Sequence, residues 1–208
     1  MARMSAEERR TKLVDAAIRV MTRDGVARAT TRAIAAEAGM PLGVFHYAFR
    51  SKQELMAMVT ETIARRSKAD IDAAVLAEGR PELFDLVRGG LMAYFDHVVM
   101  HPHEHLVTYE LTAMALREPE MEDVADRQYR YYLEENEKLV SAVAEMIGFD
   151  YSLPIPVVTR FVTSLMDGLA LNYLAKGDEE EAREVVALLA TTLVGFAMHV
   201  DTREAVDD

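Results

Sequence analysis

The feature that most constrains this chain is the length of its stretches without helix breakers. Its 208 residues include only 10 Gly and 6 Pro, and nearly all of these lie between long runs in which apolar residues recur every three or four positions. That spacing places apolar side chains on one face of an α-helix. The sequence therefore predicts an all-α fold and not a turn-rich β fold.

Nine helices are predicted from this periodicity and from the breakers between the runs. Their expected spans are 6–23, 31–38, 41–48, 52–78, 81–100, 104–117, 120–147, 155–175 and 179–200. Thr30 is the expected N-cap of the second helix. Ser51 is that of the fourth, with Glu54 three residues later as in a capping box. The fourth helix contains neither Gly nor Pro, so we expect a stiff connection between two domains.

Charge is distributed unevenly along the chain. The net charge of −12 by itself argues against a nucleic-acid partner. Residues 1–68, however, carry 13 Lys and Arg against 7 Asp and Glu, or +6, whereas residues 69–208 carry 10 against 28, or −18. A basic module joined to an acidic body is typical of proteins that bind nucleic acid, because the basic part attracts phosphate locally. A surface that is merely uneven is the alternative interpretation.

Composition limits where the protein is expected to be located and which kinds of site it is able to form. The absence of cysteine excludes disulfides, a thiolate metal site and a cysteine nucleophile. The first residues do not resemble a secretory signal, and the longest uncharged run, 185–200, is shorter than the roughly 20 residues of a membrane span. We therefore expect a cytoplasmic protein without membrane contact.

No common catalytic motif is present. The sequence lacks a Gly-x-Ser-x-Gly elbow, a dinucleotide fingerprint and a phosphate loop. We therefore expect no enzymatic activity and no cofactor. His101, His103 and His105 raise the question of a metal site, but Pro102 interrupts their helical spacing and tetrahedral zinc needs three or four convergent ligands. A solvated helix start is the preferred interpretation, and we expect no metal.

Residues 30–55 contain two short helices joined by a turn. The first, Thr31–Ala38, is rich in small residues, and Gly39 ends it. Pro41 opens the second, Pro41–Ala48. Two short helices joined by a turn of three to four residues with a Gly have the spacing of a helix-turn-helix, whose second helix fits the major groove of DNA.

Over about residues 8–60 the chain closely resembles the tetracycline-repressor (TetR) family of bacterial regulators. The matching positions are Thr30-Thr31, Ala35-Ala36, Gly39, Phe45-His46-Tyr47, Phe49, Ser51-Lys52 and Leu55. The resemblance implies a repressor that binds a palindromic DNA operator as a homodimer and releases it when a small-molecule effector binds. It implies a helix-turn-helix domain of three helices at residues 1–50 and a helical ligand-binding and dimerisation domain at residues 51–208, with the helix at 51–78 connecting the two.

The resemblance also implies which residues contact DNA. Phosphates are expected at Thr30 or Thr31, Tyr47 and Lys52. The residues expected to face the groove are Arg32, Pro41, Leu42, Gly43, Val44 and His46. Arg32 is able to read guanine, whereas the apolar residues of this set meet only thymine methyls or sugars, so we expect phosphates to supply much of the affinity. The chain departs from the common family pattern at His46, where Tyr is common, and at Ala48, where His often stands.

The family resemblance places a ligand cavity in the second domain, where Met, Tyr and Phe recur at helical spacing. The residues expected to line it are Phe95, Met100, Tyr109, Met114, Tyr132, Phe161, Met166 and Asp167. We expect a largely apolar or aromatic effector, although plain core is the alternative for most of these side chains. Asp167 lies in an apolar helix, where a carboxylate is costly unless paired. It is either a structural partner of Arg160 or a group that orients the ligand.

The last two predicted helices have broad apolar faces. They include Leu188, Leu189, Leu193, Val194 and Phe196. A helix that is apolar over most of its circumference must be buried on several sides, so we expect the pair to form a four-helix bundle with a second copy. An enzyme and a helical scaffold are the alternative classes, and a sequence-specific shift of DNA would separate a regulator from both.

Overall fold

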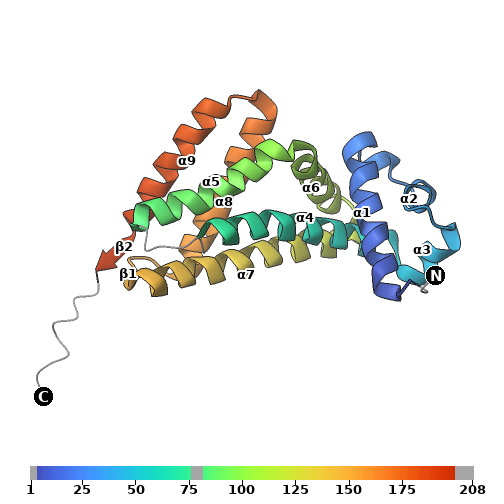
Figure 1. Ribbon diagram of the computed structural model, residues 1–208, viewed down its shortest axis with the longest axis horizontal. Helices are drawn as coiled ribbons and strands as arrows, with labels where there is room; N and C mark the ends of the chain where they lie inside the picture. Colours follow the sequence, from blue (N-terminus) through green and yellow to red (C-terminus); the bar gives the residue numbers. More distant parts are fainter. Residues whose placement is uncertain (1–3, 76–81, 200–208) are drawn as a thin grey trace, which may run out of the picture. The chain divides into compact units, whose positions relative to one another are not determined.

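The computed structural model describes residues 4–75 and 82–199, and it is built almost entirely of helices (Figure 1). In chain order, the elements of this described part are α1 (Ala6–Asp24), the 3-10 turn η1 (Val26–Arg28), α2 (Thr31–Glu37), α3 (Leu42–Ala48), α4 (Lys52–Val75), α5 (Leu83–Met100), α6 (Pro102–Ala115), the 3-10 turn η2 (Pro119–Met121), α7 (Glu122–Ile147), the strand β1 (Phe149–Tyr151), α8 (Ile155–Lys176), α9 (Glu179–Val194) and the strand β2 (Ala197–His199).

The predicted all-α fold is confirmed, and each of the nine predicted helices has a counterpart. The helix expected from Glu104 begins earlier, at Pro102, because proline fits the first turn of a helix, where its missing N–H is not needed. The expected helix ends at Glu78 and Val200 and the expected start at Pro81 lie outside the described residues.

A short ribbon of two strands was not predicted. The sequence suggested a helix through residues 179–200, but α9 ends at Val194 and β2 pairs antiparallel with β1. In this register, Phe149 lies opposite His199, and Tyr151 lies opposite Ala197. The pairing partners are separated by about fifty positions, so local periodicity carries no signal for them.

The helices form two compact units. The head unit contains the described residues up to Arg66 together with His101–Tyr131, and the body unit contains Ser67–Met100 and the described residues from Tyr132 onward. Both α4 and α7 contribute residues to each unit. The functional boundary expected near residue 50 stays a prediction, because compactness alone does not show which segment binds DNA or ligand.

The core of the head unit holds α1, α2 and α3 together. Leu13, Ile34, Phe45 and Leu55 are almost fully buried in one cluster. Small side chains on α1 and α2 let these helices approach closely. Leu111 of α6 lies in the same cluster, so the head core recruits a helix that is distant in sequence.

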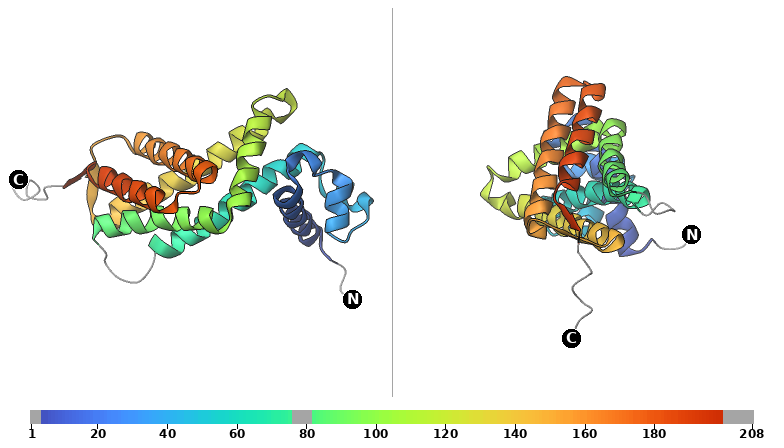
Figure 2. Two further views of the ribbon diagram at one scale, coloured as in Figure 1. Left: turned by 90° about the horizontal axis from the view of Figure 1, so that it is seen from above. Right: turned by 90° about the vertical axis from the view of Figure 1, so that its left-hand side faces the viewer.

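The body unit is built around α5, α8 and α9. Helix α5 packs along α9, and α8 lies beside α9 in both views of Figure 2. Phe95 of α5 is fully buried among apolar residues of α8 and α9, with its ring 5.1 Å from that of Tyr173. No helix in the described part of the chain is both long enough and apolar enough to cross a membrane.

Candidate nucleic-acid interface and effector region

The turn between α2 and α3 has the local geometry of a helix-turn-helix. The Thr30 hydroxyl accepts a hydrogen bond from the backbone N–H of Ala33 at 3.1 Å, which confirms Thr30 as the N-cap. Gly39 has a φ of 65°, a left-handed conformation that glycine adopts without strain. After this turn Pro41 serves as the N-cap residue of α3. The seven-residue helix α3 therefore packs against α2 directly after the turn.

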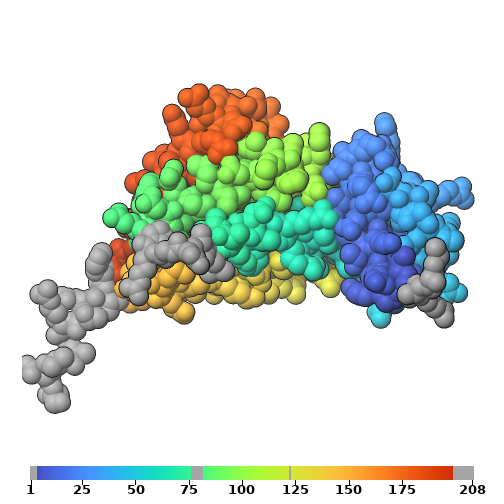
Figure 3. All heavy atoms as spheres, in the orientation of Figure 1, coloured from blue at the N-terminus to red at the C-terminus, as the bar shows by residue number. Residues whose placement is uncertain are grey.

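Helix α3 buries one face and exposes another. Phe45 and the following Phe49 are buried, with ring centroids 5.5 Å apart. Tyr47 is 95% exposed, and His46 is exposed with its ring edge against Phe45. A large aromatic side chain left almost entirely in solvent is unusual within a packed unit. Helices α1 to α3 form the surface drawn in blue in Figure 3.

Ion pairs divide the cations of the head unit into two groups. Arg19 and Arg23 on α1 both bind Glu37 of α2, at 2.9 and 3.0 Å. The two hydrogen bonds, with that of Arg19 the stronger, hold the pKa of the Glu37 carboxyl below its ordinary value. Arg32 and Lys52, in contrast, make no ion pair or hydrogen bond with any residue that the structure describes. These two cations are therefore available to an external anion.

The start of α4 is capped differently from the prediction. The Ser51 hydroxyl accepts from the N–H of Glu54 at 3.1 Å, as expected. The Glu54 carboxylate does not complete a capping box. It accepts instead from Arg10 and from the backbone N–H of Arg50, and these hydrogen bonds, that of Arg10 first, hold its pKa below the ordinary value. A complete capping box is found at Ser5 and Glu8 of α1, and the Ser-x-x-Glu pattern there is the sequence signal for it.

All ten residues expected to contact DNA lie in the head unit. Those exposed to solvent are Thr30, Arg32, Pro41, Gly43, His46 and Tyr47, and those half-buried are Thr31, Leu42, Val44 and Lys52. Leu42 and Val44 pack partly against the head core, so only part of each side chain is free for the groove. Their contacts with DNA stay predictions.

The eight residues expected around the ligand are divided between the two units. Phe95, Phe161 and Met166 share one apolar cluster of the body unit. Met100 belongs to the same unit but is 64% exposed at the end of α5. The body unit also holds Tyr132 and the half-buried Asp167.

The remaining two, Tyr109 and Met114, belong to α6 of the head unit, where Met114 packs against the core. The structure therefore does not gather the eight residues into one cluster, and their contact with a ligand stays a prediction.

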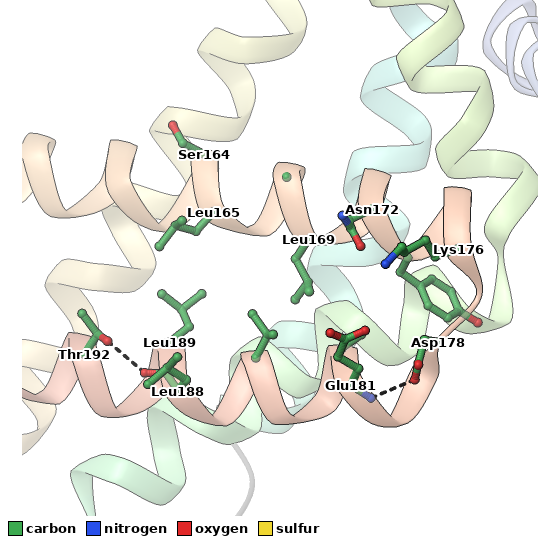
Figure 4. Close-up of a pocket in the computed structure, with 14 residues that line it drawn as sticks. Ser164, Leu165, Leu169, Asn172, Lys176, Asp178, Glu181, Leu188, Leu189 and Thr192 are labelled. Atoms are coloured by element: carbon green, nitrogen blue, oxygen red, sulfur yellow. Dashed lines mark hydrogen bonds between the residues drawn. The ribbon is translucent and has the colours of Figure 1, made fainter.

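A groove of about 500 Å³ runs between α8 and α9 (Figure 4). Leu165 and Leu169 reach into it from α8, and Leu188 and Leu189 do so from α9. Leu188 is 65% exposed. None of the eight residues expected around the ligand lines this groove.

The apolar residues predicted for the dimer interface point in different directions. Leu189 and Leu193 are buried in the core of their own chain, and Phe196 packs against Phe161 with centroids 5.6 Å apart. Leu188 faces outward. The outer face of the pair also exposes Leu165 and Val185. The buried residues of α9 (Leu189 and Leu193) form its inner stripe, and the exposed ones (Val185 and Leu188) form its outer stripe. Sequence alone did not separate the two, because both are apolar.

The histidines near residue 101 do not converge on a metal site. His101 precedes α6 as its N-cap residue and His105 is buried. Within the described ranges no three His, Cys, Asp or Glu side chains are arranged to hold a metal ion.

Comparison with known proteins covers both units. Residues 13–59 match the family described as bacterial regulatory proteins, tetR family. Residues 84–197 match the family described as BetI-type transcriptional repressor, C-terminal. The chain is also 29% identical over 183 residues to the HTH-type nicotine-responsive transcriptional repressor HdnoR of Paenarthrobacter nicotinovorans. The aligned region covers 88% of this chain and 92% of that protein.

Two solved structures illustrate the similarity of fold. The multidrug binding protein EbrR, complexed with imidazole, superposes with a TM-score of 0.63 at 29% identity, covering 94% of this chain and 93% of that one. A transcriptional regulator from Rhodococcus sp. Rha1 has a TM-score of 0.71 at 18% identity, covering 92% and 98%. The described helices therefore follow an arrangement already observed in bacterial regulators.

Proposed function

This chain belongs to the tetR family of bacterial regulatory proteins, and from that premise we propose that it binds a palindromic operator as a homodimer and releases it when a small, largely apolar effector binds. It is a DNA-binding transcriptional regulator, and its curated relative is a repressor. The family consists of regulators and not of enzymes, which confirms the expectation of no enzymatic activity.

The exposed face of α3 carries the proposal for operator binding. Tyr47 stands almost fully in solvent, and Arg32 and Lys52 have no partner in the described part of the chain. An aromatic hydroxyl and a lysine are groups that bind phosphate oxygens, and arginine reads guanine with two hydrogen bonds. A site of action on DNA also supports a cytoplasmic location for the protein.

Selection from a random pool of 40-bp duplexes tests this proposal. The purified protein should enrich duplexes with two symmetric half-sites whose centres lie one helical turn, about 34–36 Å, apart. We call the most enriched member the selected duplex. No enrichment over the starting pool, or a single half-site without symmetry, would contradict binding as a two-fold dimer.

The uncovered face of α8 and α9 supports the homodimer. Leu165, Val185 and Leu188 are exposed there around the groove, and contiguous apolar surface on a soluble chain marks an interaction site. We propose a second copy as the occupant. A two-fold interface joins the same patch from both chains, so one apolar patch is sufficient for both partners.

The compounds named for two relatives and the aromatic side chains of the body unit both support a small ring compound as the effector. The curated relative is nicotine-responsive, and the solved relative binds imidazole; both compounds are small rings that contain nitrogen. In this chain, Phe95 and Tyr173 stack edge to face, as do Phe161 and Phe196, and the half-buried Asp167 lies on the same helix as Phe161. We propose that aromatic side chains hold the effector and that Asp167 orients its polar atom.

Calorimetric titration with nicotine, imidazole and a straight-chain fatty acid tests the effector class. We expect a ring compound to bind and to release the selected duplex, and Asp167→Asn to weaken that binding at least tenfold. Binding of the fatty acid alone, or full affinity in Asp167→Asn, would contradict the assignment.

We propose that α4 transmits the effector signal. Like α7, this helix of 24 residues contains neither Gly nor Pro and contributes to both units. Only α4 also begins directly after α3, at Lys52. Thermodynamic linkage requires that the operator weaken effector binding by the same factor by which the effector weakens operator binding. Making α4 more flexible near its middle tests this role. Ile63 is buried in the head core, so replacing it would also disturb packing, whereas Ala69 is exposed.

Ala69→Gly adds backbone freedom to α4 at a cost of about 1 kcal/mol. Effector affinity should persist, whereas its dependence on the selected duplex should decrease. Ala142→Gly, an exposed position of α7, is the matched control. Equal coupling in both variants and in the parent protein would rule out this role of α4.

A further inference from the structure

Arg10 makes a set of contacts that joins α1 to the end of α3. Its guanidinium donates to the Glu54 carboxylate at 2.8 Å and to the backbone carbonyl of Ala48. The same group lies over the ring of Phe49, 4.7 Å from its centroid. A carbonyl in the last turn of a helix has no partner within the helix, and a cation is favourable there. Arg10 therefore satisfies the C-terminal end of α3.

Glu54 extends these contacts to the start of α4. One carboxylate oxygen binds Arg10, while the other accepts from the backbone N–H of Arg50 at 2.8 Å. The Glu54 backbone N–H donates to Ser51. A single carboxylate thus joins α1, the turn between α3 and α4, and the first turn of α4. The side chains of Arg10 and Glu54 are each 27% exposed, so solvent screens the pair only in part.

We propose that Arg10 and Glu54 form a clamp that positions α3 and Lys52 for operator binding without contacting DNA, an inference that rests on the proposed function. Tyr47 directly precedes Ala48, and Lys52 lies two residues before Glu54. The two expected phosphate contacts therefore flank the clamp on either side.

Packing alone holds α3 weakly at its end. The helix has seven residues, of which only Phe45 is fully buried. Without the clamp, the α3–α4 turn would have to be ordered at the moment of binding, and ordering a loop on binding costs affinity. The positive charge of Arg10 is already neutralised by Glu54, so it releases few counterions when DNA binds. This separates a positioning role from a phosphate contact.

The test measures affinity for the selected duplex as a function of salt in Arg10→Met and Glu54→Gln. Arg10→Met keeps a long apolar stem over Phe49 but removes the hydrogen bonds. We expect the Kd to rise at least tenfold in both variants. In Arg10→Met, which removes the cation, the slope of log K against log salt should stay as in the parent. Lys52→Ala, by comparison, should reduce the magnitude of that slope by about one for each protomer bound.

Two further variants separate positioning from general stability. Arg66→Met removes an ion pair with Asp15 and Glu104 elsewhere in the head unit, and its Kd should stay within twofold of the parent value. Arg10→Lys is the fallback where Arg10→Met fails to fold, because it keeps the charge but is unable to hold Glu54 and Ala48 with a planar fork. It should show an intermediate Kd and an unchanged slope. All measurements are made well below each melting temperature.

The double variant Arg10→Met/Glu54→Gln completes the test. If the two residues act as one clamp, it should bind no worse than the weaker single variant. Parent-like affinity in folded Arg10→Met or Arg10→Lys would overturn the inference, as would a slope reduced as much as in Lys52→Ala, which would make Arg10 a phosphate contact. Failure of the parent protein to enrich any duplex would instead overturn the proposed function.

Discussion

The head unit and the body unit leave opposite kinds of surface uncovered. Around α3 the head unit exposes Tyr47 and Arg32, which makes no ion pair with any residue in the described part of the chain, while Arg19 and Arg23 are bound to Glu37. On α8 and α9 the body unit exposes leucines around a groove. Exposed cations suit a polyanion such as DNA, and exposed leucines suit a second apolar surface. The two surfaces therefore differ in the partner that each is able to bind.

The largest expected effect is on the apolar surface. Leu188→Asp places a carboxylate where the second copy is expected to pack, and burial of an unpaired charge is costly. Because Leu188 is exposed in the single chain, the protomer should stay folded. Sedimentation should show monomers, and affinity for the selected duplex should fall about a hundredfold or more, because the two half-sites are then bound independently.

Leu116→Asp is the matched control for this substitution. Leu116 is 76% exposed at the end of α6, away from α8 and α9 in sequence. Its variant should remain dimeric. An unchanged dimer in Leu188→Asp, or dissociation in both variants, would place the interface elsewhere.

Substitutions on the head surface should separate phosphate contacts from base reading. Lys52→Ala and Tyr47→Phe should weaken binding to all duplexes by a similar factor, because phosphates carry no sequence information. Arg32→Ala should lower affinity for the selected duplex by about 1–3 kcal/mol and relax preference at one position of each half-site. A binding assay against single-base variants of the selected duplex compares them. Altered preference in Lys52→Ala with intact nonspecific affinity would reverse the assignment.

Acidic pH is expected to have a smaller effect, which is a loss of stability of the folded protein. In the head unit, hydrogen bonds from arginine hold the pKa of the Glu37 and Glu54 carboxyls below the ordinary 4.5. The folded state therefore binds fewer protons than the unfolded state, and the stabilisation is fully present above pH 4.5 and is lost as the pH falls below it. Melting temperatures should fall between pH 5 and pH 3, and Glu54→Gln should show a shallower decrease. An equal decrease in both proteins would contradict a contribution from Glu54.

The parts of the molecule that sequence predicted well are those specified by neighbouring residues. Thr30 and Gly39 set the start of α2 and the turn after it, and Phe45 and Phe49, four positions apart, are both buried in the core. These features depend on capping and helical spacing within about twenty residues.

The parts that sequence missed depend on distant contacts. Glu54 was assigned to a capping box, but Arg10, 44 positions away, binds its carboxylate. The inner and outer apolar stripes of α9 differ only in what packs against them, so Leu188 and Leu193 are equivalent in sequence and opposite in burial. The strand pairing of Phe149 with His199 is a further tertiary effect.

The central claim is that the surface around α3, with Tyr47, Arg32 and Lys52, binds DNA. The salt dependence of binding tests this claim most directly. If the dimer neutralises about 6–8 phosphates of the selected duplex, the slope of log K against log salt should be roughly −5 to −7 between 50 and about 200 mM salt. The account predicts that slope for the parent protein. A slope near zero would contradict it, because Arg32 and Lys52 would then have no phosphates to bind.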